Sequence, residues 1–311
     1  MSDAGVAKRF AHRLEYAGLY VAGALFRMAP DGWVYAIARA LATVAFDALR
    51  IRRDVTLSNL RLAFGESKSE REIVKIAREA YRNIGVTFIE MLFVGSMKGR
   101  IAGMVDVSET AMIREGLEKG RGAIIVSGHF GSWELNGASL VLSGIPMTVV
   151  AKKQSNPYVD RFIDDARKSF GMKVINPGAS IKHIVRALKK GEAIGLISDQ
   201  DAGRSGVFVD FFGRKASTPG GAAQLAMKFG SPLYVSMTKR TGNGRYSSLV
   251  REIAVLADDT VESLTQRFTA TIEGIIEEYP EQYFWMHRRW KTRPPGEPDV
   301  KAAGDSHAGG V

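Results

Sequence analysis

The 311-residue chain contains no cysteine. This absence excludes disulfide bonds, thiolate-bound zinc, iron–sulfur centres and a cysteine nucleophile. The sequence also lacks the G-x-S-x-G turn that presents a serine nucleophile in α/β hydrolases. Any covalent chemistry must therefore depend on other side chains.

The sequence also lacks an apolar run long enough to span a bilayer. Such a span needs about 20 apolar residues. The best candidate, 16–26, is shorter and has basic residues on both sides, which favours a segment lying in the membrane interface. Helical spacing of apolar residues extends over 10–28, 33–49 and 69–93. We therefore expect residues 1–100 to form a helical, membrane-interface region, with ordinary core helices as the alternative for the first two segments.

Acidic residues are fewer than basic ones, since 43 Lys and Arg against 33 Asp and Glu give a net charge of +10. Such a protein suits an acidic partner, which could be nucleic acid, an anionic bilayer or an acidic carrier protein. The content of 45% hydrophobic and 24% charged residues is typical of a globular protein and excludes a disordered chain.

Short β-branched runs alternate with helical stretches in the middle of the chain. Strands are expected at 123–127, 147–150, 173–175, 193–197 and 233–237, and helices at 158–170, 181–190 and 220–229. This alternation predicts an α/β domain over 101–295, with a central, mostly parallel or mixed sheet and helices on both faces. The composition of 296–311 predicts a disordered tail.

Two polar clusters follow predicted strands, where ligand sites gather in open α/β sheets. His129 and Glu134 follow the first strand, and Asp199-Gln200-Asp201 follows the fourth. A spacing of five would separate two side chains by roughly 140° within one helix, so His129 must lie in the loop before the helix. If a carboxylate binds one ring nitrogen, the other is free to accept a proton. A packed histidine with a surface glutamate is the alternative.

The motif HFGSWE at 129–134 resembles that of the bacterial lipid A biosynthesis acyltransferases, the lauroyl/myristoyl acyltransferase family. Three further motifs match in order, namely Asn156-Pro157 with Arg167 downstream, SDQDAGRSGVFVDFFGRKAST at 198–218, and QYFWMHRRWKTRP at 282–294. The resemblance covers at least 120–295 and implies a glycerolipid-acyltransferase-like fold.

The resemblance implies transfer of a fatty acyl chain from acyl carrier protein, or coenzyme A, to a hydroxyl of a membrane glycolipid such as a lipid A precursor. It places the enzyme at the cytoplasmic face of the inner membrane, peripheral or monotopic. His129 would be the general base and Glu134 would orient it, with no acyl-enzyme, no cofactor and no catalytic metal. The implied substrate-binding residues are Lys152, Lys153, Asn156, Arg167, Asp199 and Gln200. The family commonly has an Arg-Pro pair where this chain has Lys152-Lys153, and lysine cannot form the bidentate fork of arginine.

Competing hypotheses depend on other residues. Asp199 and Asp201 fit the Asp-x-Asp pattern with which glycosyltransferases hold a divalent cation, whereas in an acyltransferase Asp199 would support the histidine or the acceptor.

The basic and aromatic segment 283–291 suits single-stranded nucleic acid or a membrane interface. Since no RNA-binding fingerprint accompanies it, we expect the membrane interface and no nucleic acid, with a packed terminal segment as the alternative. A non-enzymatic, basic membrane-surface protein is the third hypothesis. The apolar, glycine-containing segment 203–213 is expected to form a hairpin or loop in the acyl groove, with a core hairpin as the alternative.

Overall fold

The computed structural model describes residues 3–93, 98–176 and 181–297. The predicted tail from 298 onward lies outside the described residues. The N-terminal part is helical, as the apolar spacing predicts, and consists of α1 (Asp3–Met28), α2 (Asp31–Asp47), α3 (Arg53–Phe64) and α4 (Glu70–Phe93). The short helix α3 was not among the expected elements.

A seven-stranded sheet forms the centre of the fold. Its strands are β1 (Val105–Asp106), β2 (Ala123–Ser127), β3 (Met147–Val150), β4 (Lys173–Ile175), β5 (Ala193–Ile197), β8 (Leu233–Gly242) and β9 (Arg245–Ile253), in the order β1-β9-β8-β2-β5-β3-β4. Neighbouring strands are parallel except for the antiparallel pair β8–β9. The prediction of a mostly parallel sheet is confirmed.

Helices cover both faces of this sheet, because successive residues of its buried strands point to opposite sides. Ile124 and Val126 of β2 pack into one hydrophobic cluster with α9 (Ile181–Lys189), α10 (Gly221–Phe229) and α11 (Val261–Glu278). Ala123 and Ile125 pack into another, with α5 (Lys98–Met104), α6 (Ala111–Glu118), α7 (Trp133–Leu142) and α8 (Pro157–Ser169). The near-continuous apolar composition of β2 is therefore that of a strand buried on both faces.

A two-stranded hairpin, β6 (Val207–Phe211) and β7 (Arg214–Thr218), stands apart from the main sheet and packs against α11. In the described part of the chain, short 3₁₀ helices occur in the connections, namely η2 (Ser108–Thr110), η3 (Gly203–Ser205) and η4 (Pro280–Gln282). Val209 and Phe211 are buried in the hydrophobic interior. The segment 203–213 therefore includes part of a hairpin, as expected, and two of its apolar side chains belong to the core; its place in an acyl groove stays a prediction.

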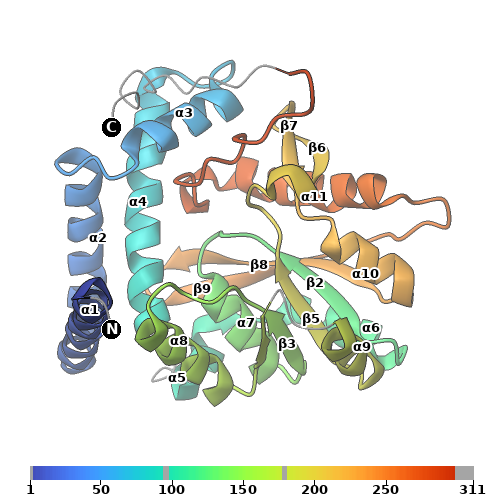
Figure 1. Cartoon of the computed structure of the whole chain (residues 1–311), viewed down its shortest axis with the longest axis horizontal. Helices are drawn as coiled ribbons and strands as arrows, with labels where there is room; N and C mark the ends of the chain where they lie inside the picture. The colour runs from blue at the N-terminus through green and yellow to red at the C-terminus, as the bar shows by residue number, and fades with distance from the viewer. Residues whose placement is uncertain (1–2, 94–97, 177–180, 298–311) are drawn as a thin grey trace.

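The long helix α4 runs along one end of the sheet domain, and α2 packs on its outer side, away from the sheet (Figure 1). α1 contacts both α4 and α8. Among the described residues, no helix combines the length and the apolar content that crossing a bilayer requires.

Candidate active site

The register of the sheet brings His129 and Asp199 together. Strands β2 and β5 are parallel neighbours in which Ser127 lies opposite Ile197, and each of the two functional residues follows two positions later. The Nδ1 atom of His129 lies 2.8 Å from Oδ1 of Asp199, and the backbone N–H of His129 donates to Oδ2 at 2.8 Å. One carboxylate therefore fixes both the ring and the backbone of the histidine.

The Asp199 carboxylate sets the protonation chemistry of this pair. Burial alone would lower the pKa of His129, but the charge of Asp199 and its hydrogen bond outweigh burial and raise the pKa above its ordinary value of 6.5. Burial would raise the pKa of Asp199, yet the interaction with His129 lowers it. With Nδ1 bonded to a carboxylate, Nε2 is the basic nitrogen of the neutral ring. No protein group in the described part of the chain hydrogen-bonds to Nε2, and the His129 side chain, which is 24% exposed, lines a cleft.

Glu134 has a different partner from the one expected. It lies in the first turn of α7 and accepts two hydrogen bonds from Arg167 of α8, at 2.6 Å and 3.1 Å. The prediction that Glu134 holds the imidazole is therefore wrong, because the sheet register places Asp199 at the ring nitrogen while the start of α7 directs Glu134 toward α8. Its charge still adds, less than that of Asp199, to the rise in the pKa of His129.

The loop after β2 is held tightly at Gly131. Its backbone has a φ of +52°, and a Cβ at this position would lie 1.9 Å from the carbonyl oxygen of Thr238, so only glycine fits. The Gly131 N–H donates to the carbonyl of Gln282 at 2.8 Å, and its carbonyl accepts from Oγ1 of Thr87 at 2.6 Å. Segments from α4 and from the C-terminal region thus fix the loop that carries the histidine.

A buried ion pair supports the Thr87 contact. Nη2 of Arg240 donates to Oγ1 of Thr87 at 2.9 Å and to Glu90 at 3.0 Å, and the hydroxyl of Tyr246 donates to the same glutamate. Burial raises the pKa of Glu90 to about 7, although the charge of Arg240 opposes this rise. A network of charged groups therefore lies behind the catalytic loop, and nothing in the composition or motifs indicated it.

Aromatic side chains surround the open side of the imidazole. The rings of Trp133 and Phe284 have their centroids 5.2 Å and 5.9 Å from that of His129. The N–H of Phe284 also donates to the carbonyl of His129 at 2.9 Å. Phe284 belongs to the C-terminal motif, so that motif contributes directly to the site.

The ring faces a cleft of about 620 Å³. Its lining is mostly apolar and includes Phe88, Met91, Trp133, Val150, Ala151, Ile163, Leu196, Ile197, Pro219, Ala222 and Phe284. A smaller pocket of about 70 Å³ shares part of this lining and continues between α7 and the sheet. Its other lining residues include Ile125, Gly137, Met147, Val149, Met172 and Gly195. The cleft that His129 lines is therefore continued by a narrow, mostly apolar pocket.

The expected substrate-binding residues divide into two groups. Lys152, Arg167 and Gln200 line the cleft. Asp199 is buried behind the imidazole, while Lys153 is exposed and lies outside the cleft lining.

Asn156 also lies outside the cleft lining, because its side chain has a structural use. It caps α8 by accepting from the N–H of Tyr158 at 3.0 Å, and its Nδ2 donates to the carbonyl of His12 and to Glu15 of α1. The structure thus gives Asn156 a capping and helix-joining role, and its substrate contact stays a prediction.

Asp199 and Asp201 bind different partners. Asp201 accepts hydrogen bonds from the N–H and hydroxyl of Thr292, at 3.1 Å and 2.9 Å, and from the N–H of Gly203 at 3.2 Å. The Asp-x-Asp pair is thus divided between the histidine and the C-terminal segment. Within the ranges that the structure describes, no three His, Asp or Glu side chains gather as a metal-ligand set.

The C-terminal aromatic segment packs inside the protein. Trp285 is 1% exposed, and Arg289 and Trp290 are also buried. Arg289 donates to the carbonyl of Ser217 and to the hydroxyl of Thr218, which ties the segment to β7. The expected membrane-interface role of 283–291 is therefore wrong, because Tyr283, Trp285 and Trp290 pack in the hydrophobic interior and Phe284 lines the cleft.

A buried aspartate–histidine pair at the carboxyl ends of parallel strands, open to an apolar cleft, defines the class of protein. This arrangement is typical of an α/β enzyme whose site lies at the carboxyl ends of the strands, and the basic ring nitrogen is suited to accepting a proton from a hydroxyl.

Comparison with known proteins identifies the family. The model of the bacterial lipid A biosynthesis acyltransferases matches residues 5–292, and the chain belongs to this family. It is 30% identical over 271 residues to a lipid A biosynthesis lauroyltransferase of Escherichia coli K12, which covers 85% of this chain and 87% of that protein. It is 30% identical over 255 residues to the palmitoleoyltransferase of the same organism, covering 80% and 82%. A phosphatidylinositol mannoside acyltransferase of Mycolicibacterium smegmatis is 28% identical over 196 residues, covering 62% and 64%.

The chain is accordingly an O-acyltransferase of the lipid A biosynthesis type, which transfers an acyl group to a glycolipid. The acyltransferase hypothesis is confirmed over the glycosyltransferase and the non-enzymatic alternatives.

Proposed function

We propose that the protein transfers a fatty acyl chain from the thioester of acyl carrier protein, or of coenzyme A, to a hydroxyl of a lipid A precursor. The observation that carries this proposal is the Asp199–His129 pair, whose ring lies in a mostly apolar cleft. The net charge of +10 favours the acidic carrier protein as the donor. The reaction takes place at the cytoplasmic face of the inner membrane, with the protein bound peripherally.

His129 acts as the general base in this mechanism. Its Nε2 takes the proton of the acceptor hydroxyl as the oxygen attacks the thioester carbonyl, and the tetrahedral intermediate then collapses with release of the thiolate. The imidazolium returns the proton to the leaving sulfur, so the ring ends in its starting state. Asp199 holds the tautomer and stabilises the imidazolium. A positioned base of this kind contributes about 10²–10⁴-fold to the rate.

The start of α7 and two cations complete the polar part of the site. Ser132 provides no side-chain cap for α7, so N–H groups of its first turn are available to the oxyanion. Lys152 supplies positive charge at the cleft for a phosphate of the substrate. Arg167 is already paired with Glu134 and lies 3.7 Å from Asp164. These two carboxylates largely neutralise the positive charge of Arg167. Its side chain therefore serves mainly as part of the cleft wall and attracts anions only weakly.

The apolar extension of the cleft receives the far end of the acyl chain. Each buried methylene contributes about 0.8 kcal/mol, so the depth of this pocket sets the preferred chain length. Gly137 and Gly195 leave room there, since a Cβ on Gly195 would lie 3.0 Å from the methyl carbon of Met147. Chain-length choice therefore depends on side chains of α7, β3 and β5.

The test is mass spectrometry of membrane lipids from cells that express the parent protein, His129→Ala or His183→Ala. We expect His129→Ala to remove one acyl chain from a glycolipid and to lower the transfer rate about 10²–10⁴-fold. His183→Ala, on the exposed side of α9, is the matched control and should leave the lipids unchanged. Full acyl transfer by a folded His129→Ala protein would contradict the mechanism.

A further inference from the structure

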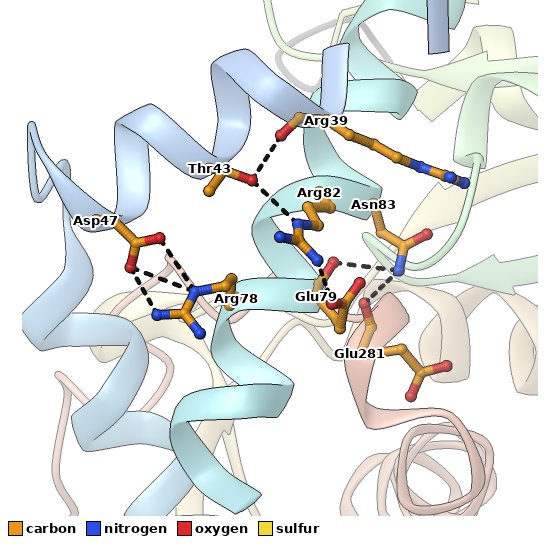
Figure 2. Close-up of polar contacts among 8 residues, drawn as sticks. All are labelled: Arg39, Thr43, Asp47, Arg78, Glu79, Arg82, Asn83 and Glu281. Carbon is orange, nitrogen blue, oxygen red and sulfur yellow. Dashed lines mark hydrogen bonds and ion pairs between the residues drawn. The ribbon is translucent and has the colours of Figure 1, made fainter. Parts of the chain in front are cut away.

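A second hollow lies between α2 and α4, and it shares no lining residue with the catalytic cleft. It measures about 360 Å³. Its walls are polar side chains of both helices together with one alanine, namely Arg39, Ala40, Thr43, Glu79, Arg82 and Asn83. Figure 2 shows Arg39, Thr43, Glu79, Arg82 and Asn83 on these two helices.

One arginine of the hollow is fixed by the fold. Nε of Arg82 donates to Oγ1 of Thr43 at 3.0 Å, and its Nη1 donates to Glu79 at 2.6 Å. Thr43 in turn donates to the carbonyl of Arg39 at 2.8 Å. The Arg82 guanidinium is therefore oriented, while its Nη2 makes no hydrogen bond within the described residues.

The other arginine has an uncommitted guanidinium. No side-chain atom of Arg39 hydrogen-bonds or ion-pairs with a described residue, and Figure 2 shows the half-buried side chain reaching past Asn83 without a contact. Its charge lowers the pKa of both Glu90 and Arg240, but neither is a contact partner. With Arg82 and Glu79 included, the hollow carries a net charge of +1, which matches the single negative charge of a phosphodiester.

An apolar surface borders this hollow. Trp33, Ile37, Leu41 and Val44 are 70%, 40%, 60% and 49% exposed, and their spacing places them on one face of α2. Ala40, which lines the hollow, lies three residues after Ile37 and four before Val44. This face belongs to the helix that packs on the outer side of α4 (Figure 1).

The same pattern continues beyond α2. Leu49 and Ile51 are 65% and 50% exposed, and they alternate with the exposed Arg50 and Arg52. Apolar side chains beside cations are what a helix lying in an anionic bilayer surface presents.

We propose that α2 lies in the bilayer interface with this face buried among the acyl chains, and that Arg39 and Arg82 bind the phosphodiester of a phospholipid headgroup. The proposal rests on the proposed function only in that the acceptor is a membrane lipid. It assigns the α2–α4 hollow to a lipid that is neither acyl donor nor acceptor. Binding there would hold the catalytic cleft at the membrane surface.

The experiment is co-sedimentation with phosphatidylcholine vesicles that do or do not contain phosphatidylglycerol, using His129→Ala protein so that turnover plays no part. Arg39→Gln should weaken binding to the phosphatidylglycerol vesicles about fivefold, and Arg39→Lys should restore part of it. Arg251→Gln is the matched control, because it removes one charge from an exposed residue of β9. An equal loss in Arg39→Gln and Arg251→Gln would overturn the proposal in favour of diffuse charge attraction.

Two further arms test the source of the phosphate and the apolar face. Calorimetry with inorganic phosphate should show no Arg39-dependent binding, and tight binding would make the hollow a site for a soluble anion instead.

Trp33→Ser combined with Leu41→Ser should abolish vesicle binding, and unchanged binding would contradict the buried face. Acyl transfer to a detergent-solubilised acceptor by Arg39→Gln should match the parent, which separates failure of this proposal from failure of the proposed function.

Discussion

The imidazole of His129 illustrates how two opposing effects set the chemistry of one residue. Burial disfavours its charged form, whereas the Asp199 carboxylate favours that form and prevails. A base with a raised pKa is stronger, but it is free of its proton only at higher pH. Activity should therefore rise with pH through a value above 6.5.

Replacing Asp199 tests this balance. Asp199→Asn should move the acidic limb of kcat/KM to lower pH, because burial then dominates the pKa of His129, and should lower the plateau about 10²–10⁴-fold. Glu134→Gln should move the acidic limb of the pH–rate profile by a smaller amount, since the charge of Glu134 has a smaller effect on the pKa of His129. The measurement is the pH–rate profile of both variants. An acidic limb that stays in place in Asp199→Asn would show that another group governs it.

Gly195 offers a second test at the scale of one residue. The Cβ of Gly195→Ala would press on Met147 and Val149, at 3.0 Å and 3.2 Å, and should shorten the apolar pocket. We expect preference to shift toward shorter chains, with about tenfold lower activity on the longest parent substrate if two methylenes lose their burial. Competition between acyl donors of different length, read by mass spectrometry, measures this. Gly144→Ala is an unsuitable control because its φ is +84°, whereas Gly274→Ala, whose Cβ would meet no atom within 4 Å, should leave the preference unchanged.

Helix α4 joins the catalytic loop to the N-terminal helices. Its Thr87 binds the Gly131 carbonyl, and its Glu90 forms the buried pair with Arg240 that holds Thr87. The same helix contributes Glu79, Arg82 and Asn83 to the hollow facing α2. One element thus bears both on the position of the base and on the proposed lipid contact.

The buried Glu90 should leave a mark on the pH dependence of stability. Its pKa in the folded protein is about 7, above the ordinary 4.5, so its contribution to stability is complete below about pH 4.5 and is lost as the pH rises through 7. Glu90→Gln should remove this decline while keeping an acceptor for Arg240. Urea unfolding of both proteins between pH 4.5 and 8 gives the difference. A difference that does not change with pH would contradict the raised pKa.

At the scale of the whole molecule, tryptophans from the N-terminal and C-terminal parts of the chain differ strongly in solvent exposure. Trp285 is 1% exposed in the interior, whereas Trp33 is 70% exposed on α2. Trp285→Ala should lower the free energy of unfolding by about 3–5 kcal/mol, and Trp33→Ala should change it by less than about 0.5 kcal/mol in the absence of lipid. Denaturant melts of the two variants make the comparison, and equal losses would contradict the described packing.

The sequence allowed the alternating strands and helices of the central sheet to be predicted, because β-branched runs such as 123–127 have a local signal. Strand β9 and helix α11 were not predicted, and 283–291 was assigned to the membrane because composition does not distinguish a buried aromatic cluster from an interfacial one. The carboxylate that binds the ring of His129 is Asp199 and not the expected Glu134, for a similar reason. Which carboxylate meets His129 depends on the pairing of β2 with β5, across 70 residues, and no local spacing encodes that register.

The clamp on the histidine loop has a consequence for biosynthesis. Gly131 and His129 are held by backbone groups of Gln282 and Phe284, which leave the ribosome some 150 residues after the loop itself. The loop that carries His129 therefore gains these two backbone contacts only after residues 282–284 have been synthesised and folded against it.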